Sequence, residues 1–166
     1  MNNGEFHTVR GYELLKQNKK LLTSSMEDYL EMIYRNSLSE GFMRMNTLAG
    51  LLNVRASSAS KMVQKLGEMG LMKYEKYGIL KLTQKGESIG KYLLTRHHVI
   101  ETFLKMIGVT ENLLGETELI EHNISIETLK NINLLNKFLG RHPEVLVWLE
   151  EYKTLHAGEE EFEGMV

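Results

Sequence analysis

Cysteine is absent from this chain of 166 residues. Its absence excludes thiolate metal sites, cysteine nucleophiles and thiol-based redox switches, and nothing indicates an oxidising compartment. Long apolar runs are also missing, since none approaches the roughly 18 residues that a membrane span needs. The N-terminus is polar and lacks the basic and apolar parts of an export signal. We therefore expect a cytoplasmic protein that is neither exported nor anchored in a membrane.

The net charge of -2 conceals a division along the chain. Residues 1–91 hold 14 Lys and Arg against 9 Asp and Glu, whereas residues 92–166 hold 6 against 13. A basic first part and an acidic second part predict one surface for an anionic polymer and another for cations or a partner. A chain of this length forms one domain, or two small ones that share a core, and needs no disulfides.

Helical periodicity dominates the start of the chain. We expect disorder over residues 1–9 and a short basic helix over residues 10–20, which is either a solvated lead-in or a contact with DNA or a second subunit. A clear helix follows over residues 26–39, with Ser25 as its N-cap. Its apolar stripe consists of Met26, Tyr29, Leu30, Ile33 and Tyr34.

Two shorter helices and a hairpin come next. Asn46 is a plausible cap for one helix, and a tight turn at residues 53–54 separates it from another helix over residues 56–69. Two short helices joined by a short turn fit the spacing of a helix-turn-helix. Alternating residues then predict a β-hairpin over residues 71–83, which would form a wing.

The helix over residues 56–69 has an outward face that suits the major groove of DNA. Small serines let the backbone approach, lysines here and on the hairpin meet phosphates, and Gln64 can pair with an adenine edge. The alternative is a solvated helix rich in Ser and Lys, but the adjoining basic hairpin favours DNA binding. The candidate DNA contacts are Arg55, Ser57, Ser58, Ser60, Lys61, Gln64, Lys65, Lys73 and Lys76.

The second half of the chain is also helical. Thr83 caps a long helix that extends to Ile107, and Ser125 caps a later one. No repeat or low-complexity linker interrupts the chain, so the two halves should be joined through the long helix. We expect three shorter helices after it, over residues 116–124, 126–139 and 143–155, and a frayed acidic tail over residues 158–166.

Six oxygen and nitrogen ligands lie in three clusters, each on a helical stretch. The first cluster is Asp28 and Glu31, with i, i+3 spacing, and the second is His97. The last is Glu118, Glu121 and His122, with i, i+3, i+4 spacing. The residues of the first cluster and those of the last therefore each project from one helix face. Carboxylates gathered there without matching Lys or Arg would repel one another unless a cation filled the gap. They could bridge two ions, which favours a binuclear site. The candidate ligands are Asp28, Glu31, His97, Glu118, Glu121 and His122.

Each ligand has another explanation when taken alone. Asp28 could be a charge at a helix start, Glu31 could pair with Arg35, and His97 could be a core or interface histidine. If they act together, carboxylates and imidazoles without sulfur favour Mn(II) over Cu(I) or a thiolate-bound metal. Other divalent transition metals should still bind in vitro, because selectivity must come from geometry and availability.

Five stretches of sequence carry a family resemblance. They are SMEDYLEMIY, SSASKMVQKL, YEKYGILKLTQKG, RHHVIETFLKMIGV and ELIEH. Their order and spacing over residues 24–140 resemble the diphtheria toxin repressor family, and within it the manganese transport regulator branch. The resemblance implies a winged helix, a helical dimerisation domain and metal as corepressor, and it places the branch's ligands at the same six positions. The iron-responsive members are similar but carry a Met in place of Asp28 and a Cys in place of Glu118.

The expected fold is mainly α with a small β-hairpin wing. We expect an N-terminal extension, a winged helix-turn-helix DNA-binding domain, a helical metal-binding and dimerisation domain and an acidic tail, over residues 1–23, 24–86, 87–157 and 158–166. The expected function is a homodimeric, Mn(II)-dependent repressor, which binds a palindromic operator in double-stranded DNA and controls metal-uptake genes.

Two other classes of protein are considered. A carboxylate-bridged dimetal enzyme needs two Glu-x-x-His motifs, and this chain has the set Glu118, Glu121 and His122 once, without a second copy. We therefore expect no enzyme. A winged-helix regulator that senses an organic ligand, with a purely structural acidic cluster, is the other alternative, and Mn(II) binding would distinguish it.

Overall fold

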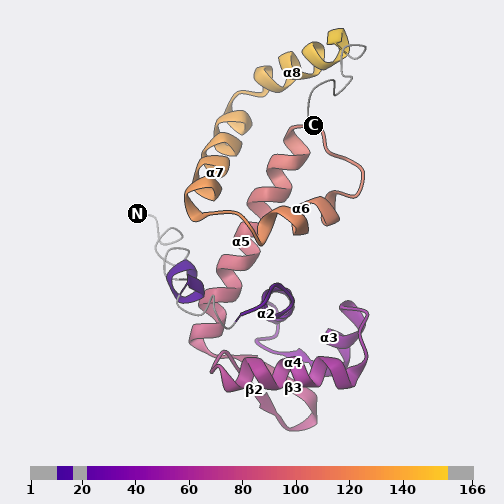
Figure 1. Cartoon of the computed structure of the whole chain (residues 1–166), viewed down its shortest axis with the longest axis vertical. Helices are drawn as coiled ribbons and strands as arrows, with labels where there is room; N and C mark the ends of the chain where they lie inside the picture. Colours follow the sequence, from indigo (N-terminus) through magenta and orange to yellow (C-terminus); the bar gives the residue numbers. More distant parts are fainter. Residues whose placement is uncertain (1–10, 17–21, 157–166) are drawn as a thin grey trace, which may run out of the picture. The chain divides into compact units, whose positions relative to one another are not determined.

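The computed structural model describes residues 11–16 and 22–156. The chain divides into two compact units, Met1–His97 and His98–Val166. Helices make up most of both units, and a small three-stranded sheet belongs to the first (Figure 1). The expected class, mainly α with a small hairpin, is confirmed. Among the described residues, none of the helices combines the length and the apolar character that crossing a bilayer requires.

The N-terminal extension contributes a short helix over residues 11–16. It lies inside the segment predicted to be a basic helix, and its Leu15 is buried. This burial argues against a fully solvated lead-in, because a solvated segment leaves its apolar side chains in water. The disorder predicted for residues 1–9 and the frayed tail predicted for residues 158–166 lie outside the described residues.

Helix α2, Ser24–Ser37, packs its apolar stripe into the core of the first unit. Its N-cap is Thr23, whose hydroxyl accepts a hydrogen bond from the amide of Met26 at 3.4 Å. The prediction of Ser25 as the cap is wrong, because Thr23 has the extended backbone that a cap requires and the chain is already helical at the next residue. Beyond α2, Gly41 takes φ +75° and lets the chain reverse.

The helix-turn-helix consists of α3, Met45–Leu51, and α4, Ala56–Glu68. A turn at the predicted position, residues 53–54, separates them, and Asn53 adopts φ +50°, which asparagine tolerates better than most residues. Asn46 does not cap α3. The helix already begins at Met45, directly after the short strand β1, Met43–Arg44, and its N-cap residue is Arg44, which has an extended backbone.

The predicted wing is present as β2, Met72–Glu75, and β3, Ile79–Leu82, which pair antiparallel. A single helical turn over residues 76–78 joins them, with Tyr77 at φ +63°. Strand β1 pairs with the free side of β3 and gives the order β1-β3-β2. The sequence did not predict β1, because a strand of two residues shows no alternation of apolar and polar side chains.

Helix α5, Gln84–Met106, is the long helix expected after the wing, and its residues are shared between the two units. The hydroxyl of Thr83 accepts a hydrogen bond from the amide of Gly86 at 3.1 Å, which confirms the predicted cap. Gly108, with φ +95°, follows the helix end. The buried face of α5 includes Ile89, Leu93, Ile100 and Leu104.

The second unit continues with three helices, α6, Leu113–Glu121, α7, Ile126–Arg141, and α8, Pro143–His156. Ser125 caps α7 as predicted, since its hydroxyl accepts from the amide of Thr128 at 3.1 Å. Helix α6 begins and ends three residues earlier than predicted, because Asn112 in the left-handed conformation sets its start. Two polar contacts tie the later helices to α5: Asn136 donates to the carbonyl of Val99 at 2.8 Å, and Lys153 donates to that of Ile107 at 2.7 Å.

Candidate metal centre and DNA-binding face

Two of the predicted ligands come together in the first unit. Glu31 on α2 and His97 on α5 offer ligand atoms within 4.8 Å of one another. Both residues are buried, with 8% and 6% of their surface exposed. Charged and polar groups are rarely buried without a partner or a cation. A carboxylate oxygen beside an imidazole nitrogen suits a divalent ion such as Mn(II), Zn(II) or Co(II).

Glu31 also has a basic neighbour on its own helix. Its Oε1 accepts a hydrogen bond from Arg35 Nη2 at 2.7 Å, across the i, i+4 spacing of α2. The expectation that the carboxylates lack matching Lys or Arg is therefore wrong for Glu31, and the pairing named as its alternative is present. A carboxylate has about four lone-pair sites on two oxygens, so this pairing does not by itself prevent metal binding. Asp28, three residues before Glu31, is partly exposed.

A buried ion pair that the sequence did not predict lies next to these ligands along the chain. Arg96 on α5 is 4% exposed, and its Nη2 donates to Oε2 of Glu27 on α2 at 2.9 Å. Arg96 immediately precedes His97, and Glu27 lies one helical turn before Glu31. The partners are 69 residues apart, so no local pattern could reveal the pair.

Tyr92 lies one turn before Arg96 and is 2% exposed. Burial raises the pKa of its phenol to about 12. Arg96 opposes this rise, whereas Tyr12 and Glu27 add to it. The phenol therefore stays protonated at any physiological pH and remains a neutral neighbour of the ion pair.

Two further predicted ligands adjoin each other in the second unit. Glu121, the last residue of α6, is 2% exposed, and its Oε1 lies 3.9 Å from Nε2 of the partly buried His122. They sit at a helix C-terminus, where the partial negative charge of the last carbonyls favours a cation. Glu118 is exposed and does not join Glu121 and His122 in any group of donor atoms within 4.8 Å among the described residues.

Glu101 on α5 contacts two residues of its own helix. Its carboxylate accepts a hydrogen bond from Lys105 at 2.9 Å, and Nδ1 of the exposed His98 lies 4.0 Å away. These contacts run along the surface of α5. Exposed pairs of this kind contribute about 0–1 kcal/mol, so they characterise a solvated face rather than a site.

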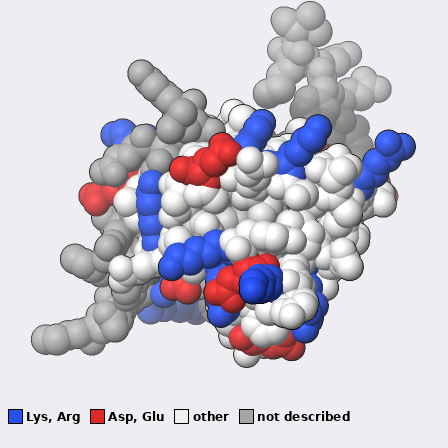
Figure 2. Space-filling view, turned by 90° about the horizontal axis from the view of Figure 1, so that it is seen from below, with Lys and Arg blue, Asp and Glu red and all other residues white. Residues whose placement is uncertain are grey.

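The predicted DNA-reading face is fully available to solvent. All nine candidate contacts on α4, on β2 and beside them are exposed. Figure 2, which views the first unit from the side of α4 and the hairpin, shows Lys and Arg spread over this face with acidic groups between them. Gln64 Nε2 donates to Glu68 Oε1 at 3.2 Å, which occupies one of the two N–H groups of the amide and leaves its other N–H and its oxygen for a base edge. On the wing, Lys81 pairs with Glu75 at 3.1 Å.

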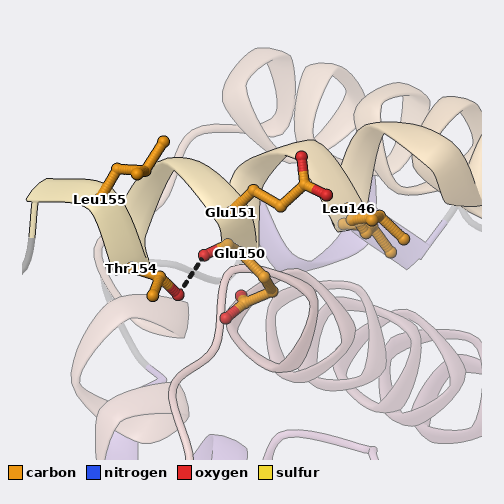
Figure 3. Close-up of a pocket in the computed structure, with 6 residues that line it drawn as sticks. Leu146, Glu150, Glu151, Thr154 and Leu155 are labelled. Atoms are coloured by element: carbon orange, nitrogen blue, oxygen red, sulfur yellow. Dashed lines mark hydrogen bonds between the residues drawn. The ribbon is translucent and has the colours of Figure 1, made fainter.

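The second unit exposes many large apolar side chains. On α7 they are Leu134, Leu135 and Phe138, and on α8 they include Val147, Trp148, Tyr152 and Leu155. Figure 3 shows one stretch of α8, where Leu146 and Leu155 flank Glu150, Glu151 and Thr154 around a shallow apolar hollow. So much exposed apolar surface is typical of a site that another protein surface covers.

Comparison with known proteins agrees with both units. Residues 21–80 match the family model for the iron-dependent repressor N-terminal DNA-binding domain, and residues 83–148 match that for its metal-binding and dimerisation domain. The HTH-type transcriptional regulator MntR of Lysinibacillus sphaericus is 43% identical over 135 residues, which cover 81% of this chain and 97% of the relative. The regulator of the same name from Oceanobacillus iheyensis is 45% identical over 118 residues, 70% of this chain and 80% of the relative.

A solved structure of the manganese regulator SloR aligns with a TM-score of 0.59 and 31% identity. The alignment covers 69% of this chain and 53% of the SloR chain, so this chain spans about half the length of that protein.

A winged helix with an exposed basic face, followed by a metal-binding and dimerisation domain, defines a metal-dependent, DNA-binding transcriptional regulator. The chain belongs to the iron-dependent repressor family, the diphtheria toxin repressor family that the sequence resembles, and the two relatives described above are named MntR. The family consists of transcriptional repressors, and this excludes the dimetal enzyme considered above.

Proposed function

We propose that this protein represses metal-uptake genes in response to Mn(II), with the ion acting as corepressor. The observation that carries the proposal is that Glu31 and His97 are both buried and that their carboxylate and imidazole ligand atoms lie within 4.8 Å of each other. The two residues belong to two helices of the first unit, α2 and α5. Oxygen and nitrogen donors without sulfur fit Mn(II). The names of the relatives, a manganese regulator among them, support the choice of metal.

The proposed ligands are the six expected from the sequence: Asp28, Glu31, His97, Glu118, Glu121 and His122. Their four carboxylates have enough oxygens to bridge two ions in each subunit. Glu118 would have to turn its exposed side chain to take part. Bound Mn(II) supplies positive charge that offsets the repulsion among its carboxylate ligands.

Metal binding at α2 would restrain the DNA-reading helix through the packing of α2. Helix α2 packs against α3, α4 and β3, so any restraint on Asp28 and Glu31 also restrains the elements that meet DNA. When the metal already holds the chain in its DNA-binding arrangement, the free energy of DNA binding is not reduced by the cost of ordering the protein. Mn(II) would thus shift the population toward the DNA-binding state by its differential affinity for that state.

We further propose that the repressor acts as a homodimer on a palindromic operator. The exposed apolar side chains of α7 and α8 would be covered by the second subunit, and a twofold dimer places two recognition helices on two half-sites. Lys61, Lys65 and the wing lysines would contact phosphates, while Gln64 would contact base edges.

Calorimetry with Mn(II) tests the metal proposal directly. The unchanged chain should bind Mn(II) saturably, and Glu31→Gln should bind it more weakly because the amide lacks the negative charge of the carboxylate. Glu13→Gln, on an exposed carboxylate, is the matched control and should bind as the unchanged chain does. If the unchanged chain binds no Mn(II), the regulator of this fold that senses an organic ligand becomes the better account.

A further inference from the structure

The short helix over residues 11–16 packs closely on α5 within the first unit. A Cβ added at Gly11 would lie 2.3 Å from the carbonyl oxygen of Ser88 and 2.7 Å from Cβ of Tyr92. The ring of Tyr12 lies against that of Tyr92, with centroids 5.7 Å apart. Only glycine allows this approach, so a larger residue at position 11 would force the helix away from α5.

This helix adjoins the Glu27–Arg96 ion pair through Tyr92. Tyr92 is one turn before Arg96 on α5, and both side chains are almost fully buried. Residues four apart lie on the same face of a helix, so Tyr92, which meets Tyr12, and Arg96, which bonds to Glu27 at 2.9 Å, share one face of α5. A buried ion pair is strengthened by the exclusion of water.

The ion pair in turn fixes α2 against α5 at the level of two proposed ligands. Glu27 is four residues before Glu31 on α2, and Arg96 is adjacent to His97 on α5. A bond of 2.9 Å between Glu27 and Arg96 therefore restrains the separation of Glu31 and His97. The matched DNA-binding model begins at residue 21, so the helix that supports the pair lies outside the region matched to the family.

We propose that the helix over residues 11–16 is a brace that holds the Glu27–Arg96 pair and thereby sets the metal affinity of Glu31 and His97. Glu27 and Arg96 are positioning residues in this scheme, because they hold the helices that carry the ligands. The proposal rests on metal binding by Glu31 and His97, as the proposed function states. The restraint that the short helix places on α2 does not depend on metal.

Four forms of the full-length chain test the brace. Gly11→Val displaces the helix without altering a ligand. Glu27→Gln removes the negative charge of the ion pair and keeps the size and shape of the side chain. The double variant combines the two, and Glu13→Ala on the exposed side of the same helix is the control. Mn(II) affinity is measured by electron paramagnetic resonance, Co(II) coordination by visible absorption, and the order of α2 in metal-free protein by hydrogen exchange.

We expect Glu27→Gln to weaken Mn(II) binding about 10-fold, as the loss of a residue that orients a ligand does. Gly11→Val should weaken it several-fold, change the Co(II) spectrum and speed exchange over residues 24–37. The double variant should lose less affinity than the product of the single losses, because both act through one contact. Glu13→Ala should match the unchanged chain.

The brace is overturned if the unchanged chain binds Mn(II) and Gly11→Val binds it equally, with α2 exchange unaltered. It is also overturned if the losses of the two single variants multiply, since they would then act independently. If the unchanged chain binds no Mn(II), the metal proposal itself fails, and hydrogen exchange in metal-free Gly11→Val still decides whether the helix restrains α2. Glu27→Asp, which keeps the charge, should bind Mn(II) more tightly than Glu27→Gln if the ion pair is the link.

Discussion

The carboxylate of Glu31 accepts a hydrogen bond from the guanidinium of Arg35 at 2.7 Å, one turn further along α2. Arg35 is 39% exposed, whereas the side chain of Glu31 is only 10% exposed. One carboxylate oxygen of Glu31, a proposed metal ligand, is therefore already bonded to the guanidinium of Arg35. Any divalent ion at Glu31 has to share that carboxylate with a positive charge.

Removing that charge should favour the metal. In Arg35→Met, the repulsion between guanidinium and bound ion disappears, and we expect Mn(II) to bind between about two- and fivefold more tightly, in line with the value of an exposed pair. Titration followed by electron paramagnetic resonance measures the change. Arg55→Met, which removes an exposed arginine beside α4, is the control for net charge. Unchanged binding in Arg35→Met would mean that Arg35 does not compete with the ion, and weaker binding would mean that Arg35 orients Glu31 for it.

Asp28 should influence which metal activates the repressor. It supplies a hard anionic oxygen at the position where the family resemblance implies a Met in iron-responsive members, so Asp28→Met should weaken the response to Mn(II) more than that to Fe(II). Folding should stay nearly intact, because Asp28 is partly exposed in the first turns of α2. Operator binding, titrated anaerobically with each ion, gives the ratio of activating concentrations. A ratio equal to that of the unchanged chain would make Asp28 a helix-start charge and not a ligand.

Gln64 and the lysines around it should affect DNA binding in different ways. Gln64→Ala should cost about 1 to 3 kcal/mol on the operator and relax specificity, because a base contact is lost. Lys61→Ala should weaken binding to every sequence and lower the salt slope by about one. Affinities for operator and random DNA at several salt concentrations separate the two.

Glu68→Ala is a matched control for Gln64. It removes the partner of the Gln64 amide without removing the amide, so the ratio of specific to non-specific affinity should be preserved. If Gln64→Ala also preserves that ratio, Gln64 does not read bases.

The exposed apolar face of α7 should form part of a dimer interface. Leu135 is 42% exposed and Phe138 47%, and a charge buried at such a position is costly when two subunits meet. We therefore expect Leu135→Glu to sediment as a monomer at micromolar concentration where the unchanged chain sediments as a dimer. Lys137→Glu, on the same helix but at an exposed polar position, should remain a dimer. A monomeric unchanged chain, with or without Mn(II), would contradict the proposed homodimer.

Much of this fold follows from local sequence. The recognition helix, the wing and the caps at Thr83 and Ser125 were all predictable, because each depends on residues within a few positions of one another. The cap of α2 was misplaced by two residues, since Thr23 and Ser25 both have side chains suited to capping and only the backbone conformation decides between them. Strand β1 was missed because its two residues become a strand only by pairing with β3.

The six metal ligands stay a prediction, but the structure tests part of their surroundings. Spacing on α2 and α6 identified carboxylates on shared helix faces, and the structure places Glu31 beside His97. The Glu27–Arg96 pair could not be predicted, because it joins residues far apart in sequence and has no spacing of its own. The exposure of Glu118 also depends on how α6 lies in its unit, which the i, i+3, i+4 pattern does not fix.

Operator binding with and without Mn(II) tests the central claim most directly. Fluorescence anisotropy at fixed salt compares the unchanged chain in chelator with the same chain in excess Mn(II), on operator and on random DNA. The corepressor account predicts weak, sequence-indifferent binding in chelator and tight, operator-specific binding with Mn(II). Equal affinity for the operator in both conditions would contradict it.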